Sequence, residues 1–255
     1  ALVLGGAISD GYAVRAAEVL GADFAYMGTR FIATRESNAQ EAYKQMLIDS
    51  AAEDVVYTDA ISGDWGGRVY EDLMKVTEHL AGLPFVDRDR MGAMGWSYGG
   101  YMVNWIEGHD NPFKCLASMM GAFDLSSKYG ATEELWFPEW DLRGTPWDSE
   151  DYKKWNPADR VRNFKTPMLV ISGEKDYRIA YTESLQMFTA LQKRKVPSRL
   201  VIFPRAGHWP SWYEMAFYYL VHLDWFHRYL GGPPAPYDVQ DFLRNRAFKG
   251  GAKAK

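Results

Sequence analysis

The sequence predicts an α/β fold, in which a mostly parallel sheet carries helices on both faces. Two observations lead to this fold class. Short apolar runs, typical of strands buried on both faces, alternate with stretches of helical periodicity along much of the 255 residues. Polar or glycine-bearing turns follow several of these runs. Such alternation implies a doubly wound sheet with the active groups at the carboxyl ends of its strands.

The elements are expected in a regular order. Strands are predicted at residues 2–4, 24–27, 114–120, 168–172 and 200–203, and a further strand begins near residue 90 and ends at residue 97. Helices are predicted at residues 10–20, 38–50, 69–80, 181–192 and 212–230. In the helix at 69–80, Leu73, Val76 and Leu80 recur at helical spacing, and Gly82 and Pro84 end the pattern.

Residues 95–99 read Gly-Trp-Ser-Tyr-Gly and match the pattern G-x-S-x-G. The pattern lies between a short apolar run and an apolar stretch that begins at Tyr101. Strand, sharp turn and helix are the context in which a serine is exposed as a nucleophile. The flanking glycines are expected to relieve the crowding of so tight a turn. The sequence therefore predicts that Ser97 is a catalytic nucleophile.

Two partners for Ser97 follow in the order acid, then histidine. Asp176 comes just after the apolar run 168–172, and His208 comes just after the run 200–203. A serine needs a base within hydrogen-bond reach, and the base needs an orienting carboxylate. The chain order Ser, Asp, His is that of the α/β-hydrolases. We therefore predict a catalytic triad of Ser97, Asp176 and His208, which needs neither a metal nor an organic cofactor.

The oxyanion hole and the substrate pocket are less fully defined by the sequence. The amide of Tyr98, directly after the nucleophile, is expected to supply one oxyanion donor. We assign the second donor to Gly6, which follows the first predicted strand; the alternative is that this loop forms only a turn. The segment 123–155 is rich in aromatic residues, which either line a pocket over Ser97 or pack the segment onto the sheet. The pocket residues that we predict are Trp96, Trp136 and Trp140.

From about residue 58 to residue 237 the chain resembles the catalytic domain of the prolyl oligopeptidase family, nearest to its acylaminoacyl-peptidase branch. The motifs that carry the resemblance include Ser62-Gly63-Asp64-Trp65-Gly66-Gly67, Ser97-Tyr98-Gly99-Gly100-Tyr101, Gly173-Glu174-Lys175-Asp176-Tyr177-Arg178 and Gly207-His208-Trp209. The resemblance implies the same triad and the hydrolysis of peptides, acylated peptides and simple esters. Members of that family also have a β-propeller and a set of first strands ahead of this region, and neither of these family features is recognisable in residues 1–57.

Residues 1–63 resemble a different family, the nitronate monooxygenases (2-nitropropane dioxygenases). The matching stretches are Leu4-Gly5-Gly6-Ala7-Ile8-Ser9-Asp10-Gly11 and Met27-Gly28-Thr29-Arg30-Phe31-Ile32-Ala33-Thr34. That family is a flavin-dependent (β/α)8 barrel, in which these loops hold the FMN phosphate. We therefore expect a fusion of three parts. A barrel-like segment at 1–62 completes the sheet, a hydrolase domain spans 63–237, and a tail spans 238–255.

Composition excludes several classes of function. The formal net charge of −4 offers no broad basic surface to nucleic acid or to an anionic membrane. A single cysteine, Cys115, excludes an internal disulfide and is expected to be buried on a strand. No apolar run approaches the ~18 residues of a membrane span. We therefore expect a cytoplasmic protein that binds neither membrane nor nucleic acid.

Three functions fit the sequence. The main interpretation is a serine esterase that acts on small esters, because a rebuilt site is expected to keep the easier ester reaction. The alternative is an oligopeptidase or acylaminoacyl-peptidase that acts on short peptides. A more distant alternative is a flavin-binding monooxygenase fragment. Because the hydrolase part supplies only part of a sheet, we also expect self-association into a homo-oligomer.

Overall fold

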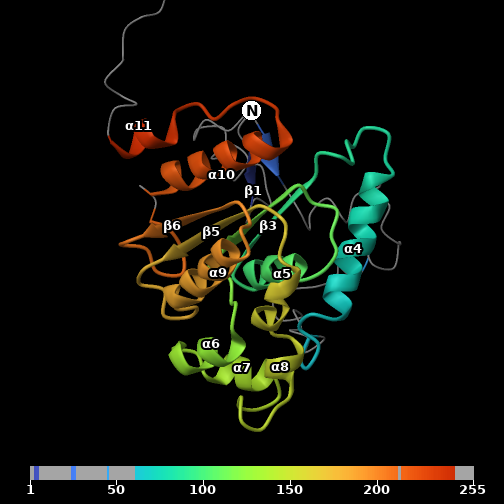
Figure 1. Cartoon of the computed structure of the whole chain (residues 1–255), viewed down its shortest axis with the longest axis vertical. Coiled ribbons are helices and arrows are strands. Elements are labelled where there is room, and N and C mark those ends of the chain that lie inside the picture. The colour runs from blue at the N-terminus through green and yellow to red at the C-terminus, as the bar shows by residue number, and fades with distance from the viewer. Residues whose placement is uncertain (1–2, 6–23, 27–44, 46–60, 212–213, 245–255) are drawn as a thin grey trace, which may run out of the picture. The chain divides into compact units, whose positions relative to one another are not determined.

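The structure is a computed structural model of the chain (Figure 1). It describes residues 3–5, 24–26, 45, 61–211 and 214–244. The chain divides into two compact units, residues 1–58 and residues 59–255, which are described separately.

The first unit contains two short parallel strands, β1 (Val3–Gly5) and β2 (Phe24–Tyr26). Val3 lies opposite Phe24, and Gly5 lies opposite Tyr26. Both strands were predicted, each to within one residue at either end. The predicted helix at 10–20 lies outside the described residues, as does the helix at 38–50 apart from Gln45.

The second unit is built on a parallel sheet of four strands in the order β3-β4-β5-β6. The strands are β3 (Gly92–Trp96), β4 (Cys115–Met119), β5 (Met168–Gly173) and β6 (Ser198–Phe203). All four match the apolar runs that predicted them. Because sequential strands lie side by side and run in one direction, their carboxyl ends meet at one edge of the sheet.

Helices connect and flank these strands. They are α4 (Arg68–Ala81), α5 (Tyr98–Glu107), α6 (Leu125–Ala131), α7 (Trp136–Asp141), α8 (Asp151–Lys154), the 3-10 helix η2 (Pro157–Asn163), α9 (Tyr181–Lys193), α10 (Met215–Leu230) and α11 (Val239–Leu243). The segment 123–155, predicted only as an aromatic insertion, forms α6, α7 and α8. In the view of Figure 1 these three short helices lie together below α5 and α9.

The two central strands, β4 and β5, are buried on both faces under helices, as their continuous apolar runs indicate, whereas Met94 and Trp96 of the edge strand β3 are partly exposed. On β4, Leu116 belongs to the core under α5 and α9, while its neighbours Cys115 and Ala117 belong to the core under α10 and α11. The same alternation of period two continues on β5. Figure 1 shows α10 and α11 on one side of the sheet and α5 and α9 on the other. Cys115 is fully buried, as predicted, and burial raises the pKa of its thiol to about 12.

The chain after residue 237 begins with a helix that packs against α10. The Phe242 ring stacks on Phe217 at a centroid distance of 5.8 Å, and Val239 is buried in the core beneath it. The Asp238 carboxylate caps α11 by accepting a hydrogen bond from the backbone N–H of Asp241. The predicted tail therefore starts as an ordered element, and its remainder from residue 245 lies outside the described residues.

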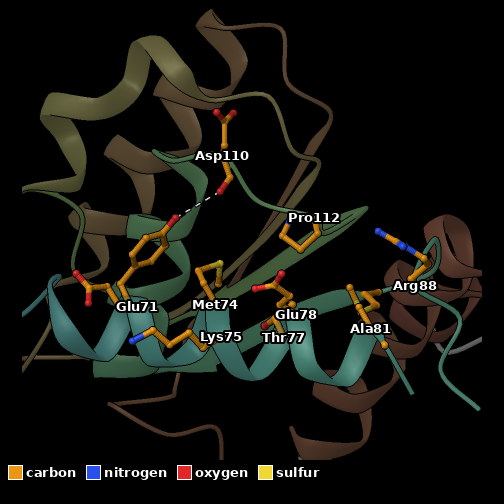
Figure 2. A pocket seen from close by; sticks show the side chains of 12 residues that line it. Glu71, Met74, Lys75, Thr77, Glu78, Ala81, Arg88, Asp110 and Pro112 are labelled. Carbon is orange, nitrogen blue, oxygen red and sulfur yellow. Dashed lines mark hydrogen bonds between the residues drawn. The ribbon is translucent and has the colours of Figure 1, made fainter. Parts of the chain in front are cut away.

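Helix α4 is amphipathic, but none of its residues is buried. An apolar groove of about 720 Å³ separates it from β3 and α5, and Leu73, Leu80 and Met94 line this groove. A second groove, of about 700 Å³, runs along an adjacent face of α4 and shares Met74 and Thr77 of that helix with the first groove (Figure 2). Glu71, Lys75 and other polar side chains of the helix line the second groove. Among the described residues, no helix is long and apolar enough to cross a membrane.

Candidate active site

Ser97 lies on a strained turn between β3 and α5. Its backbone has φ 60° and ψ −119°, a conformation that costs a non-glycine residue on the order of 1–3 kcal/mol. Two hydrogen bonds hold the turn: Ser97 N–H donates to the Met119 carbonyl at 2.9 Å, and Tyr101 N–H donates to the Ser97 carbonyl at 2.9 Å. The first bond ties the turn to the end of β4, and the second begins α5. This is the strand-turn-helix arrangement that the motif predicted.

The two glycines of the motif have different roles. A Cβ atom added at Gly95 would overlap the backbone of Gly99, whose Cα would lie 2.9 Å away. A Cβ atom added at Gly99 would meet nothing within 4 Å. The tight turn therefore requires glycine only before the nucleophile, and the expectation that both glycines relieve crowding is wrong for Gly99.

This difference predicts a contrast between two alanine variants. Gly95→Ala should lower kcat/KM by about 100-fold or more, because the turn must shift and a displacement of about 1 Å in a catalytic group has that effect. Gly99→Ala should stay within a few-fold of the wild type, since its methyl group enters open space. Initial rates of the two purified variants test the contrast. Equal losses in both would show that the crowding at Gly95 does not hold the nucleophile in place.

Asp176 lies in the loop that follows β5, and only 2% of it is exposed. Its Oδ1 atom accepts hydrogen bonds from the backbone N–H groups of Arg178, at 3.0 Å, and Ile179, at 2.9 Å. A Cβ atom added at Gly173 would overlap the carbonyl groups of Ala206 and Gly207. The missing side chain of Gly173 thus lets the acid loop pack directly against the loop that carries His208.

His208 lies between the acid and the serine. Its Nδ1 atom is 2.7 Å from Asp176 Oδ2, and its Nε2 atom is 2.8 Å from Ser97 Oγ. The Trp96 indole N–H donates to the His208 carbonyl at 3.0 Å, and the two rings lie 4.9 Å apart. The structure therefore brings the three predicted residues into one hydrogen-bonded line, with the imidazole held from both ends and against Trp96.

The predicted oxyanion donors can be located only in part. Tyr98 is the first residue of α5, and helix geometry leaves the first N–H groups of a helix without an intrahelical partner. Within the part of the chain that the structure describes, no acceptor is found for its amide, which can therefore bind an oxygen atom beside Ser97. The Tyr98 hydroxyl donates to the Trp65 carbonyl at 2.7 Å, which fixes this side chain. Gly6 lies outside the described residues, so its assignment stays a prediction.

A pocket of about 260 Å³ opens beside Ser97 and His208. Of the three tryptophans that we predicted for the substrate pocket, Trp96 and Trp136 line this cavity, whereas Trp140 does not and is 66% exposed. Both interpretations of the aromatic segment hold for different residues, because Tyr152 and Trp155 are buried in the core. The remaining lining residues are Trp65, Tyr98, Tyr101, Ala122, Lys128, Glu134, Phe137, Arg178 and Ile179.

Charged side chains contribute to this pocket, and sequence reasoning missed two of them, Lys128 and Glu134. Arg178 Nε lies 3.4 Å from the Glu134 carboxylate and 3.7 Å from that of Glu133. Arg178 is thus paired with carboxylates. No group of three or more residues of the types that bind metal ions occurs in the described part of the chain.

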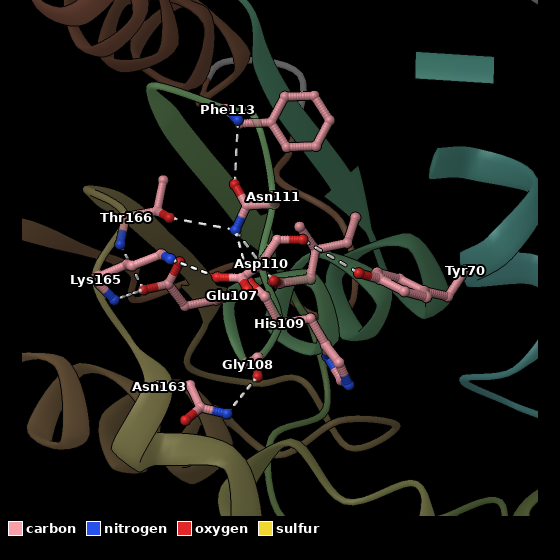
Figure 3. A network of polar contacts seen from close by, with 11 residues as sticks. Tyr70, Glu107, Gly108, His109, Asp110, Asn111, Phe113, Asn163, Lys165 and Thr166 are labelled. Atoms are coloured by element: carbon pink, nitrogen blue, oxygen red, sulfur yellow. Dashed lines mark hydrogen bonds and ion pairs between the residues drawn. The ribbon is translucent and has the colours of Figure 1, made fainter. Parts of the chain in front are cut away.

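The far end of α5 is anchored by a buried carboxyl group (Figure 3). Glu107 Oε1 accepts hydrogen bonds from the backbone N–H groups of Lys165, at 2.6 Å, and Thr166, at 2.8 Å. Its Oε2 atom is buried and has no partner among the described residues. Burial raises the pKa of the Glu107 carboxyl to about 7, and the two backbone N–H groups lower it by less. Because α5 starts at Tyr98, this anchor also fixes the helix that follows the nucleophile.

The raised pKa of Glu107 predicts a pH dependence of stability. The folded state holds the proton more tightly than the unfolded state, so this group stabilises the fold fully below about pH 4.5 and loses that contribution as pH rises to about 7. The loss is on the order of 3 kcal/mol. Urea unfolding at pH 5 and pH 7.5 should show it in the wild type and show much less of it in Glu107→Gln. An unchanged pH dependence in the variant would contradict this account.

Comparison with known proteins decides the family. The model of the prolyl oligopeptidase family matches residues 50–233. The chain belongs to the prolyl oligopeptidase family. Ser97, Asp176 and His208 all lie within the matched range, so the family match and the hydrogen-bonded line concern the same part of the chain.

Curated relatives agree with this family. The chain is 45% identical over 181 residues to "Probable dipeptidyl-peptidase 5" of Aspergillus terreus, an alignment that covers 68% of this chain and 25% of the relative. It is 41% identical over 157 residues to "Dipeptidyl-peptidase 5" of Schizosaccharomyces pombe, which covers 60% of this chain and 23% of the relative. The chain thus spans about a quarter of the length of these relatives.

A solved structure of a similar protein supports the fold. The acylaminoacyl peptidase of Pyrococcus horikoshii superimposes on this chain with a TM-score of 0.64 and 27% sequence identity. The aligned region covers 72% of this chain and 32% of the peptidase chain. The predicted α/β-hydrolase fold is confirmed by this likeness together with the parallel sheet. The nitronate monooxygenase model matches residues 2–93, which overlap the first match at residues 50–93. Both predicted resemblances are therefore confirmed, and the expected junction near residues 58–63 lies within the overlap.

Proposed function

We propose that the chain is a serine hydrolase that cleaves peptide bonds in short peptides through a covalent acyl-enzyme. The observation that carries this proposal is the hydrogen-bonded line from Ser97 through His208 to Asp176. Family membership and the likeness to proteins named dipeptidyl-peptidase and acylaminoacyl peptidase support peptides over the esters that the sequence favoured. The peptide reaction is thus preferred to the first interpretation of the sequence.

Each group has a defined role in the proposed reaction. Ser97 Oγ attacks the acyl carbonyl carbon while His208 Nε2 accepts the hydroxyl proton. Asp176 holds the Nδ1–H and stabilises the imidazolium that forms. The imidazolium then gives its proton to the leaving amine as the C–N bond breaks, which leaves the acyl group on Ser97. A water molecule, activated by the same Nε2 atom, hydrolyses this ester and restores the enzyme. The Tyr98 N–H stabilises the oxyanion in both steps.

Ester hydrolysis is the second candidate, and the oxyanion hole favours it. Among the described residues we identify one donor, the Tyr98 N–H, and the absence of a donor costs about 100-fold or more in rate. An ester has a better leaving group than an amide and therefore tolerates a weaker oxyanion hole. The two candidates use the same triad and differ only in the balance of their rates.

A substrate panel tests the proposal. The purified chain and its Ser97→Ala variant are assayed with p-nitrophenyl esters and with peptide p-nitroanilides. Hydrolysis of the anilides by the wild type and not by the variant is the expected result. Hydrolysis of esters alone would replace peptide cleavage by the second candidate. Equal activity of the variant and the wild type would overturn the serine mechanism itself.

A further inference from the structure

A buried lysine lies in the pocket beside the nucleophile. Lys128 is the fourth residue of α6, a helix whose start is fixed by the Asp124 carboxylate, which accepts hydrogen bonds from the N–H groups of Ser126 and Ser127. Only 3% of Lys128 is exposed. Lysine is almost never fully buried unless it is paired. A buried ammonium group in this position is therefore expected to have a partner of opposite charge.

The charged neighbours of Lys128 are engaged with other groups. Burial lowers the pKa of Lys128 to about 8, and the charges of Glu134, Asp141 and Glu183 partly offset this effect. Glu134 is paired with Arg178 at 3.4 Å. Asp141 accepts a hydrogen bond from the Trp65 indole at 3.0 Å. Among the described residues, we find no hydrogen bond or ion pair to the Lys128 ammonium.

Glu183 is likewise engaged elsewhere. Its Oε2 atom accepts the backbone N–H groups of Phe123, at 2.9 Å, and Asp124, at 2.8 Å. Burial raises the pKa of the Glu183 carboxyl, as it does that of Asp141, so these two acids compensate the ammonium less than two ionised groups would. The contact that remains for the ammonium is the face of Phe137, whose centroid lies 5.2 Å from Nζ.

The free ammonium belongs to the same pocket as the reacting groups. Lys128, Ser97 and His208 all line the cavity of about 260 Å³, and Phe137 lines it too. A cavity of this size accepts one side chain of a substrate. Its other walls are largely aromatic, and an ion pair gains strength where apolar walls exclude water.

We propose that the Lys128 ammonium binds a carboxylate on the side chain of the substrate residue whose carbonyl carbon Ser97 attacks. Three N–H donors of one buried cation match a carboxylate better than they match an amide or an alkyl group, because a hydrogen bond between charged groups is the stronger. Glu134 does not cancel this preference, since Arg178 already pairs with it. Lys128 thus acts as a specificity-determining residue, an inference that rests on the serine hydrolase function proposed above.

Two substrates that differ in one group test the inference. An N-acetylated dipeptide p-nitroanilide with Glu beside the scissile bond is compared with the same compound carrying Gln, which has the same size and no charge. The wild type should show a kcat/KM ratio of Glu to Gln substrate of about tenfold or more. Lys128→Met should reduce the ratio to about one or less while the Gln substrate is still cleaved. Lys154→Met is the matched control, because Lys154 also lies over an aromatic ring, at 4.2 Å, but does not line the pocket.

The pH dependence of the ratio separates recognition from a structural effect. In the wild type the ratio should fall as pH rises through about 8, where the ammonium loses its charge, and this measurement stands even if Lys128→Met does not fold. A wild-type ratio near or below one, or a ratio that survives Lys128→Met, would overturn the inference alone. If neither anilide is cleaved at all, the proposed peptidase function fails together with it.

Discussion

Replacing Ser97 with alanine should lower kcat on the order of 10⁶-fold for every substrate, with no loss of folded protein. The hydroxyl is the group whose oxygen becomes bonded to the acyl carbon, and no other residue of the hydrogen-bonded line can take that position. The Tyr98 amide and the pocket stay in place in the variant, so substrate binding should change far less than kcat. Steady-state rates, measured beside circular dichroism and thermal melting of both proteins, test this expectation.

A matched control for Ser97→Ala is Ser126→Ala. Ser126 is an exposed serine in the first turn of α6 and does not line the pocket. Its replacement should leave kcat and KM within a few-fold of the wild type. Residual activity in Ser97→Ala at more than a thousandth of the wild-type rate would contradict the assignment of the nucleophile.

Replacing Asp176 with asparagine should lower kcat by about 10⁴-fold. The Asn side chain can keep its oxygen on the N–H groups of Arg178 and Ile179, which hold Asp176 Oδ1 now. Its amide nitrogen then faces His208 Nδ1, where it donates a hydrogen bond instead of accepting one. That interaction favours the tautomer with the proton on Nε2, which cannot accept the proton of Ser97. The fold should be unaffected, because the backbone contacts survive.

Asp148→Asn is the control for the acid. Asp148 is exposed and accepts a hydrogen bond from Thr145 at 2.6 Å. It forms no part of the hydrogen-bonded line of three residues. Asp151, three residues further along the chain, is paired with Arg143. The kcat values of Asp176→Asn and Asp148→Asn, with circular dichroism as a check on folding, show whether Asp176 is the acid of the triad or has only a structural role. An Asp176→Asn enzyme with more than a tenth of wild-type kcat would show that another group orients the imidazole.

The triad could be predicted because each of its members follows a strand, and strands of a parallel sheet end at one edge. The apolar runs before Ser97, Asp176 and His208 are strong local signals, and their chain order matched a known order. The sheet and the helices α4, α9 and α10 were predictable for the same reason. Their periodicity extends over enough residues for the pattern to be distinctive.

The pocket was harder to predict because its residues come from short helices. Trp136 and Trp140 both lie on α7, and no sequence pattern indicates which of them lines the pocket beside Ser97. Lys128 was equally hard to predict, because in the sequence it resembles an ordinary surface lysine and only the tertiary packing shows that it is buried. Glu107 shows a similar effect, since its hydrogen-bond partners Lys165 and Thr166 are distant in the sequence.

Labelling of the nucleophile tests the central claim most directly. The purified chain is treated with a fluorophosphonate probe, digested with trypsin and mapped by mass spectrometry. The peptide at residues 91–114 contains a single serine, Ser97. The account predicts one adduct per chain on this peptide, and none on the same peptide of Ser97→Ala. An adduct on another peptide, or one that persists in Ser97→Ala, would contradict it.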